Sequence, residues 1–203
     1  MTATRQPTEK RKVQIAQAAL KIIAEEGLGK FTAAAIAKEV GIADGTVFRH
    51  FDSKDSIVAF AIEMIEKMMF SESPPEHDDP LERLGIFIRQ RFQLVSEQPV
   101  VFKIFFSDQL VQAAGENGAA KVRELQRSSL EFVYKCLKEA SEKGLLKPGA
   151  SPEQLMIIIN GTIIGSIFSS VIEKAFPFEN QPKLSTAKKA EQIWNSIELL
   201  IRR

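Results

Sequence analysis

Two short helical patterns separated by a glycine occupy residues 32–51, in the run TAAAIAKEVGIADGTVFRHF. Thr32 is a typical helix N-cap, and the alanine-rich run that follows places its apolar residues on one face. Gly41 supplies the left-handed residue that commonly ends a helix. Two short helices joined by a tight turn containing glycine form a helix-turn-helix, whose second helix can enter the DNA major groove.

The second half of this run has an alternative interpretation. The Asp-Gly pair at 44–45 followed by Thr-Val-Phe also has the chemistry of a hairpin turn entering a strand. A strand would place Val47, Arg49 and Phe51 on one side, with a charge between two apolar residues. A helix instead places Val47 and Phe51 four residues apart on one apolar face. We therefore expect a helix that begins at Ala43 or at the residue after it.

The run from Thr32 to Lys54 resembles the DNA-binding segment of TetR/AcrR transcriptional regulators, whose pattern is roughly T-x-x-x-I-A-x-x-x-G-V-S-x-G-x-(L/I)-Y-x-(H/Y)-F-x-(S/N)-K. The resemblance implies an all-α fold. A three-helix helix-turn-helix domain is expected over residues 1–52, followed by a helical ligand-binding and dimerisation domain over residues 53–203. The implied function is that of a repressor which binds a near-palindromic operator as a homodimer and is released by a small ligand.

The residues of this segment suit DNA contacts on physical grounds. Gly45 lets backbone amides approach phosphates, Lys54 stands at the start of a helix, and Arg49 carries donors for phosphates or base edges. Ala43 replaces a Ser or Thr cap of the family pattern, and Phe48 replaces a Tyr whose hydroxyl commonly contacts a phosphate. The full set of expected DNA-binding residues is Thr32, Ala43, Asp44, Gly45, Thr46, Phe48, Arg49, His50 and Lys54.

The remainder of the chain has helical periodicity throughout, without an internal repeat. The first helix is expected to start after Pro7 and to end at Gly27, and Ser53 is expected to cap the helix that ends near residue 70. Further helices are predicted at about residues 80–96, 99–111, 117–143, 152–176 and 186–202, between Pro- and Gly-containing breaks.

Two of the last helices carry a pattern suited to a partner subunit. Small residues recur every four positions at Gly161, Gly165 and Ser169, and an apolar stripe follows on the final helix. The family resemblance implies that these helices pair with their copies in a four-helix bundle, which makes a twofold dimer. The alternative is the internal core of a monomer. The expected interface residues are Gly161, Gly165, Ser169, Ile193, Trp194, Ile197 and Ile201.

An aromatic and methionine-rich set of residues lies between these regions and suits either a ligand pocket or a plain core. The resemblance favours a pocket for a small apolar or aromatic effector, which shifts the population toward a form that no longer fits the operator. The expected lining residues are Met64, Met68, Phe87, Phe92, Gln93, Phe102, Phe106, Phe132, Cys136 and Asn160.

Residue types and motifs argue against an enzyme. The chain has two histidines and one cysteine, and it lacks a phosphate-binding glycine loop or a nucleophile motif. The acidic run EHDD at 76–79 could attract a metal, but it suits a helix cap better. We therefore expect no catalytic residue, no cofactor and no metal. A helical carrier of apolar ligands without DNA binding is the alternative function.

Nothing in the sequence predicts a membrane association. The N-terminus is polar and basic without a following apolar segment, so no signal peptide is expected. The longest apolar run, at 155–168, is shorter than the roughly 20 residues that span a bilayer. Together with the single cysteine, these features predict a cytoplasmic protein.

Overall fold

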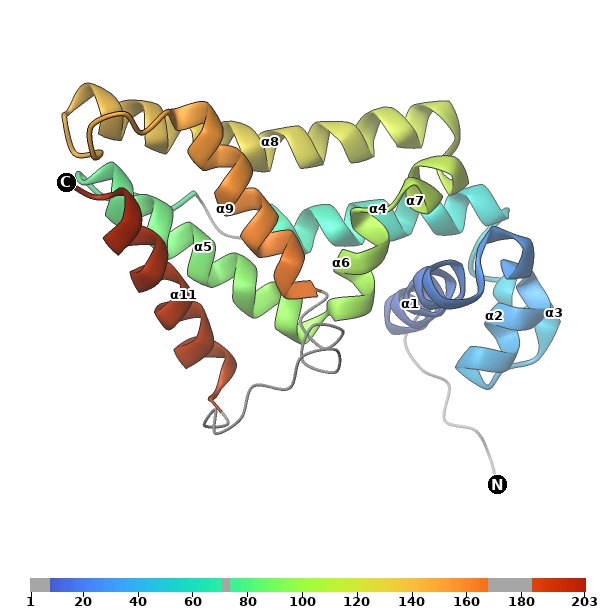
Figure 1. Cartoon of the computed structure of the whole chain (residues 1–203). Coiled ribbons are helices and arrows are strands. Elements are labelled where there is room, and N and C mark those ends of the chain that lie inside the picture. Colours follow the sequence, from blue (N-terminus) through green and yellow to red (C-terminus); the bar gives the residue numbers. More distant parts are fainter. Residues whose placement is uncertain (1–7, 71–73, 168–183) are drawn as a thin grey trace. The chain divides into compact units, whose positions relative to one another are not determined.

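The described part of the chain is helical. The structure, a computed structural model, describes residues 8–70, 74–167 and 184–203. These residues form helices and one isolated β-bridge, between Leu146 and Arg202 (Figure 1). The predicted all-α fold is confirmed. Within these ranges, no helix combines the length and the apolar character needed to cross a membrane.

The helices follow the sequence periodicity closely. They are α1 (Thr8–Glu26), a 3-10 turn η1 (Leu28–Lys30), α2 (Ala33–Val40), α3 (Asp44–Val47), α4 (Lys54–Phe70), α5 (Pro80–Glu97), α6 (Pro99–Phe105), α7 (Asp108–Ala113), α8 (Gly115–Glu142), α9 (Pro152–Ile167) and α11 (Thr186–Ile201). One helix was predicted over residues 152–176. Residues 168–176 of that prediction lie outside the described residues.

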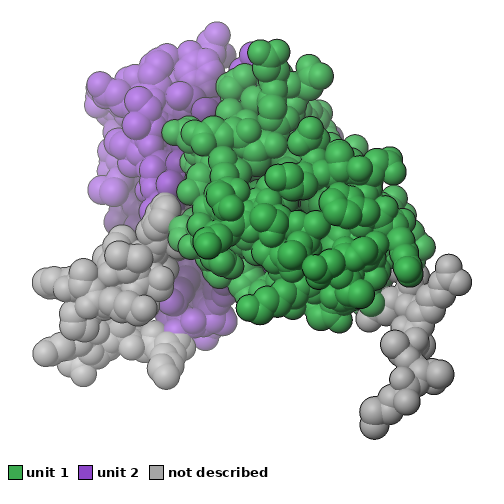
Figure 2. All heavy atoms as spheres, turned by 90° about the vertical axis from the view of Figure 1, so that its right-hand side faces the viewer, with its two compact units in different colours: residues 1–68, 100–124 green, residues 69–99, 125–203 purple. Residues whose placement is uncertain are grey.

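The chain packs as two compact units, which Figure 2 colours separately. The first unit comprises residues 1–68 and 100–124, and the second comprises residues 69–99 and 125–203. These packing units differ from the functional division expected at residue 52, because α6, α7 and the start of α8 pack with the N-terminal helices. The expected extent of the DNA-binding segment therefore stays a prediction.

The first unit is built on α1. One face of this helix is buried, and Gly27 ends it with a positive φ of 87°. Helices α2 and α7 both pack against α1. The single helix predicted over residues 99–111 is wrong, because α6 ends at Phe105 and α7 begins at Asp108. At the junction, the amide and the hydroxyl of Ser107 both donate to the Ile104 carbonyl, at 3.0 and 2.8 Å, which terminates α6.

The second unit is centred on α5, which packs against both α9 and α11. Gly85 on α5 allows the closest approach, because a Cβ atom there would lie 2.5 Å from the Trp194 indole of α11. Trp194 is 1% exposed, and Ile197 and Ile201 of the same helix are also buried. The apolar stripe of α11 therefore packs inside its own chain.

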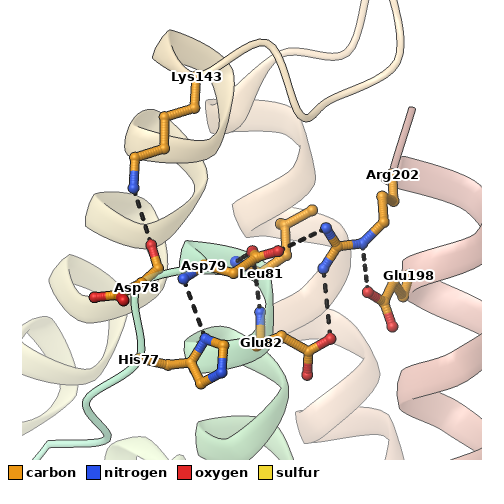
Figure 3. A network of polar contacts seen from close by, with 8 residues as sticks. All are labelled: His77, Asp78, Asp79, Leu81, Glu82, Lys143, Glu198 and Arg202. Carbon is orange, nitrogen blue, oxygen red and sulfur yellow. Dashed lines mark hydrogen bonds and ion pairs between the residues drawn. The ribbon is translucent and has the colours of Figure 1, made fainter.

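A polar network fastens the C-terminus to the start of α5 (Figure 3). Asp79 caps α5, and its Oδ1 accepts from the Leu81 amide at 2.8 Å. Its Oδ2 accepts from Arg202 at 2.8 Å, while Arg202 also donates to Glu198 at 2.5 Å and lies 3.6 Å from a Glu82 oxygen. The acidic run at 76–79 thus contains a helix cap, as expected.

Further backbone contacts extend this network. The Asp79 amide donates to His77 Nδ1 at 3.1 Å, and Lys143, which directly follows α8, donates to the Asp78 carbonyl at 2.9 Å. The Arg203 amide donates to the Leu145 carbonyl at 2.8 Å. The end of α11, the loop after α8 and the start of α5 are consequently held together.

The charge of Asp79 makes this junction sensitive to acid. Burial opposes the charged form, but the hydrogen bond from Arg202 and the two amide hydrogen bonds lower the Asp79 pKa below its ordinary value. A lowered pKa gives stability that is present above the unfolded-state value of about 3.9 and is lost as the pH falls through the folded-state value.

We expect Asp79→Ala to lower the free energy of unfolding by about 0.5–2 kcal/mol at pH 7, because it removes both the cap and the ion pair. The loss should shrink as the pH falls from about 5 toward the folded pKa. Asp79→Asn keeps a capping oxygen and should lose less at pH 7. Urea unfolding of the three proteins at pH 7 and pH 3 measures this, and a pH-independent loss for Asp79→Ala would contradict it.

Candidate nucleic-acid interface and effector cavity

The segment from Thr32 to Phe51 forms two short helices and a turn. Thr32 caps α2, and its Oγ1 accepts from the Ala35 amide at 3.1 Å. Gly41 ends α2 in the left-handed region, with φ 72°. Helix α3 then begins at Asp44, which excludes the hairpin alternative. Ala43 is its N-cap and provides no side-chain hydrogen bond, as the missing Ser or Thr of the family pattern implies.

Apolar contacts hold α3 in position from one side. Val47 is completely buried and Phe51 is 6% exposed, so both face the interior as predicted. The Phe51 ring packs edge-on against Phe60 of α4, with ring centres 5.5 Å apart. The turn after α3 keeps helical hydrogen bonds, including one of 3.1 Å from the Phe51 amide to the Val47 carbonyl. The opposite side of α3 is thereby fixed toward solvent.

Most of the expected DNA-binding residues are exposed to solvent. Seven of them are exposed, and the remaining two, Thr46 and His50, are half-buried. The ring of Phe48 is 53% exposed, which is unusual for a large apolar side chain in the absence of a partner. Gly45 has open space where a Cβ would stand. The exposed residues are Thr32, Ala43, Asp44, Gly45, Phe48, Arg49 and Lys54.

Lys54 stands at the start of α4, next to a well-formed cap. The Ser56 amide donates to Ser53 Oγ, and the Ser53 amide donates to Ser56 Oγ, each at 3.1 Å. This reciprocal pair confirms Ser53 as the cap and resembles a capping box. Lys54 Nζ lies 5.6 Å from the centre of the Phe31 ring. Such a terminus with an added cation suits a phosphate.

A cavity of about 280 Å³ lies within the second unit, between α5, α8 and the segment before α5. Of the ten residues expected to bind an effector, Phe132 and Cys136 line it. The other lining residues were not predicted from the sequence; they are Pro74, Pro75, Glu76, Arg83 and Lys135. The spacing of Arg83 and Phe87, four residues apart on α5, was the available signal that Arg83 lies on a buried helix face.

The remaining expected pocket residues are distributed over both units. Phe87 and Phe92 belong to the core of the second unit, and Phe87 packs on Phe132 with ring centres 4.6 Å apart. Gln93 is exposed and donates to Glu97 at 2.9 Å, so its expected role as an orienting group inside a pocket does not fit. Asn160 is half-buried on α9. Phe102 is buried in the first unit, where Met64, Met68 and Phe106 are half-buried.

A buried arginine beside the core of the second unit was also not predicted from the sequence. Arg91 on α5 is 8% exposed, and its Nη1 donates to the Met69 carbonyl at 2.8 Å. Its guanidinium lies 4.6 Å from the centre of the Phe87 ring and 5.4 Å from that of Phe70. Burial lowers its pKa to about 10, so it stays charged near neutral pH. Arg91 thus donates to a carbonyl near the end of α4, and its guanidinium lies close to two aromatic rings.

The residues expected at a dimer interface separate into two groups. Trp194, Ile197 and Ile201 lie in the core of their own unit, and this burial removes them from the outer surface. Gly161 is exposed, and Gly165 and Ile193 are half-buried. Ser169 lies outside the described residues. The large apolar side chains that are exposed on α9 and α11 are Ile157, Ile158, Leu199 and Leu200, which are 59–75% exposed.

The exposed α3, the capped start of α4 and the helical second unit define a helix-turn-helix protein of the kind found among transcriptional regulators. The family model described as "Bacterial regulatory proteins, tetR family" matches residues 15–60. Residues 15–60 therefore resemble the DNA-binding segment of the tetR family.

Curated relatives extend the similarity beyond the DNA-binding segment. The nucleoid occlusion factor SlmA of Marinomonas sp. (strain MWYL1) is 27% identical over 164 residues, which cover 75% of this chain and 81% of that protein. The fatty acid metabolism regulator protein of Bacillus subtilis (strain 168) is 27% identical over 157 residues, covering 74% of this chain and 78% of that protein.

Solved structures share the whole fold. The ketosteroid transcriptional regulator KstR2 of Mycobacterium tuberculosis superposes with a TM-score of 0.73 at 18% identity, covering 95% of each chain. AibR, solved with isovaleryl coenzyme A and operator DNA, has a TM-score of 0.64 at 19% identity, covering 92% of this chain and 97% of AibR. At these identities, the likeness concerns the fold alone.

Proposed function

We propose that this protein is a repressor that binds a near-palindromic operator as a homodimer and leaves it when an acyl compound binds. The observation that carries the proposal is the exposed surface of α3 and of the start of α4. There Gly45 and Lys54 match the spacing of the family's DNA-binding segment, and Arg49 is exposed between them. Arg49 is the base-reading residue, while Lys54 and the amides near Gly45 hold the phosphate backbone.

A homodimer is supported by the apolar surface that α9 and α11 leave uncovered. Ile157 and Ile158 on α9, and Leu199 and Leu200 on α11, would be costly to expose in a monomer. Pairing of these helices with their copies buries them and gives a twofold assembly. Two recognition helices about 34–36 Å apart would then match half-sites one helical turn apart.

We expect Leu199→Lys to shift the protein from dimer to monomer, because a charge is placed in the centre of the apolar contact. Gln192→Lys adds the same charge at an exposed polar position of α11 and serves as the matched control. Light scattering after size-exclusion chromatography gives the mass of each variant. Equal dimer content in the two variants would exclude Leu199 from the interface.

The class of effector is supported by the cavity and by the relatives. The cavity has the apolar ring of Phe132 and two prolines in its wall. AibR was solved with isovaleryl coenzyme A, and the Bacillus subtilis relative is named for fatty acid metabolism. An acyl compound, as a free acid or as its coenzyme A thioester, is the effector that we propose for this chain.

A gel shift on the DNA upstream of the protein's own gene tests the function. We expect specific binding at low salt that weakens steeply as salt rises, because phosphate contacts release counterions. Added acyl compound should then reduce the shifted fraction. A helical carrier without DNA binding, the alternative function, predicts no specific shift at any salt concentration, and that result would reject the regulator.

A further inference from the structure

We infer that the cavity between α5, α8 and residues 74–76 binds a small monocarboxylic acid, with Arg83 and Lys135 receiving the carboxylate and Phe132 with the two prolines receiving the apolar body. The inference rests on the proposed function and specifies its effector site. All seven lining residues belong to the second unit, so the site is complete within it.

The size of the cavity limits the ligand. Its volume of about 280 Å³ falls just below the roughly 300–1,000 Å³ typical of sites for drug-sized ligands. A short branched or aromatic acid fills such a space, whereas a complete coenzyme A thioester is far too large to be enclosed.

The charges around the cavity favour an anion. Arg83 is paired with Glu139, but Glu139 also accepts from Lys143 at 2.9 Å, so two cations share one carboxylate. Lys135 adds a third cation on the exposed rim, against the carboxylate of Glu76. Among the lining residues, Arg83 and Lys135 carry positive charge and Glu76 carries negative charge, so the lining itself favours an anion.

Arg83 lies half-buried in the cavity wall. Its Nε is buried, so a ligand in the cavity would meet the terminal nitrogens of the guanidinium, one of which pairs with Glu139. The nearby Cys136 does not neutralise Arg83 as a thiolate, because burial raises the Cys136 pKa despite the opposing effect of the Arg83 charge. A carboxylate is the acceptor that a guanidinium binds best, since it forms charge-assisted hydrogen bonds.

The walls of the cavity favour an apolar body behind the carboxylate. Cys136 is 1% exposed and Phe132 is half-buried, whereas Pro74, Glu76 and Lys135 are exposed. Glu76 and Lys135 are thus nearer to solvent than the phenyl ring and the sulfur, while Arg83 is half-buried like Phe132. This gradient suits an amphipathic acid that inserts its apolar end and leaves its charge beside the two cations.

The chain contains a built-in reporter for this site, because Cys136 is its single cysteine. Benzoate and the neutral isostere benzamide are the probes. By titration calorimetry on the full chain, we expect benzoate to bind about ten-fold more tightly, since hydrogen bonds to charged groups are the stronger ones. Saturating benzoate should also slow modification of Cys136 by methyl methanethiosulfonate, followed by intact mass.

Variants with exposed side chains assign the charges without threatening the fold. Lys135→Ala should weaken benzoate binding by about two- to five-fold, and Glu76→Gln should tighten it by about two-fold. Lys138→Ala removes an exposed lysine from α8 that does not line the cavity, and it should leave benzoate binding unchanged.

Three results would overturn the inference: equal affinity for benzoate and benzamide, equal effects of Lys135→Ala and Lys138→Ala, or protection of Cys136 by isovaleryl coenzyme A but not by free acids. The gel shift separates this inference from the proposed function. If benzoate binds with the expected charge dependence but leaves operator binding unchanged, the carboxylate site stands and its role as effector site is rejected. If specific operator binding is absent while benzoate protects Cys136, the regulator is rejected and the site stands.

Discussion

Arg49→Ala is expected to reduce operator affinity by about 5- to 150-fold, which corresponds to the roughly 1–3 kcal/mol of a bidentate base contact. Arg49 is exposed in the turn that follows α3, and its neighbours Val47 and Phe51 are buried, so the helix keeps its place when the guanidinium is removed. The loss should be largest at one position of each half-site, where sequence preference relaxes. Fluorescence anisotropy with the operator and with single-base variants measures both effects.

The Lys54→Ala variant distinguishes contacts to the DNA phosphate backbone from contacts to the bases. Lys54 stands at the N-terminus of α4, where the proposed phosphate contact would be independent of sequence. Its removal should weaken binding to all sequences alike and reduce the slope of log affinity against log salt by about 1. Lys138→Ala, on α8, is the control and should change neither quantity. If Arg49→Ala lowered affinity for operator and random DNA equally, Arg49 would be assigned to the backbone.

The helices of this fold were predictable from local sequence patterns. The break between α6 and α7, which was not predicted, has a local cause. The capping signals of α2 and the Pro-rich start of α5 lie within a few residues of the helices they limit. The break between α6 and α7 was missed because the apolar pattern continues through it. A hydrogen bond from the Ser107 side chain, which the pattern does not encode, ends α6.

The helix-turn-helix segment was also predictable, because its residues lie close together in the sequence and one short pattern fixes their spacing. The cavity joins α5, α8 and the Pro74–Pro75 segment, which are far apart in the sequence. No local pattern encodes how such elements meet. The apolar stripe of α11 shows a second limit of prediction from sequence. Apolar spacing predicts that these residues are buried, but it does not tell whether they pack against α5 of the same chain or against another subunit.

The contact between α5 and α11 should dominate the stability of the second unit. Trp194 is 1% exposed in the core, and Trp194→Ala is expected to lower the free energy of unfolding by about 3–5 kcal/mol. A loss of this size is a large fraction of the stability of an ordinary domain. Asn195→Ala, at an exposed position of the same helix, should stay within about 0.5 kcal/mol of the parent protein.

Gly85→Ala tests the same contact from the other side. The added methyl group would lie 2.5 Å from the Trp194 ring, and both the α5 backbone and the indole are rigid, so α11 must move. Overpacking of this kind costs about 1–3 kcal/mol. Combining Gly85→Ala with Trp194→Phe gives the smaller ring room for the methyl group, so the double variant should lose less than the sum of the two single losses. Urea unfolding of the four proteins measures this coupling, and additive losses would mean that the clash is relieved elsewhere.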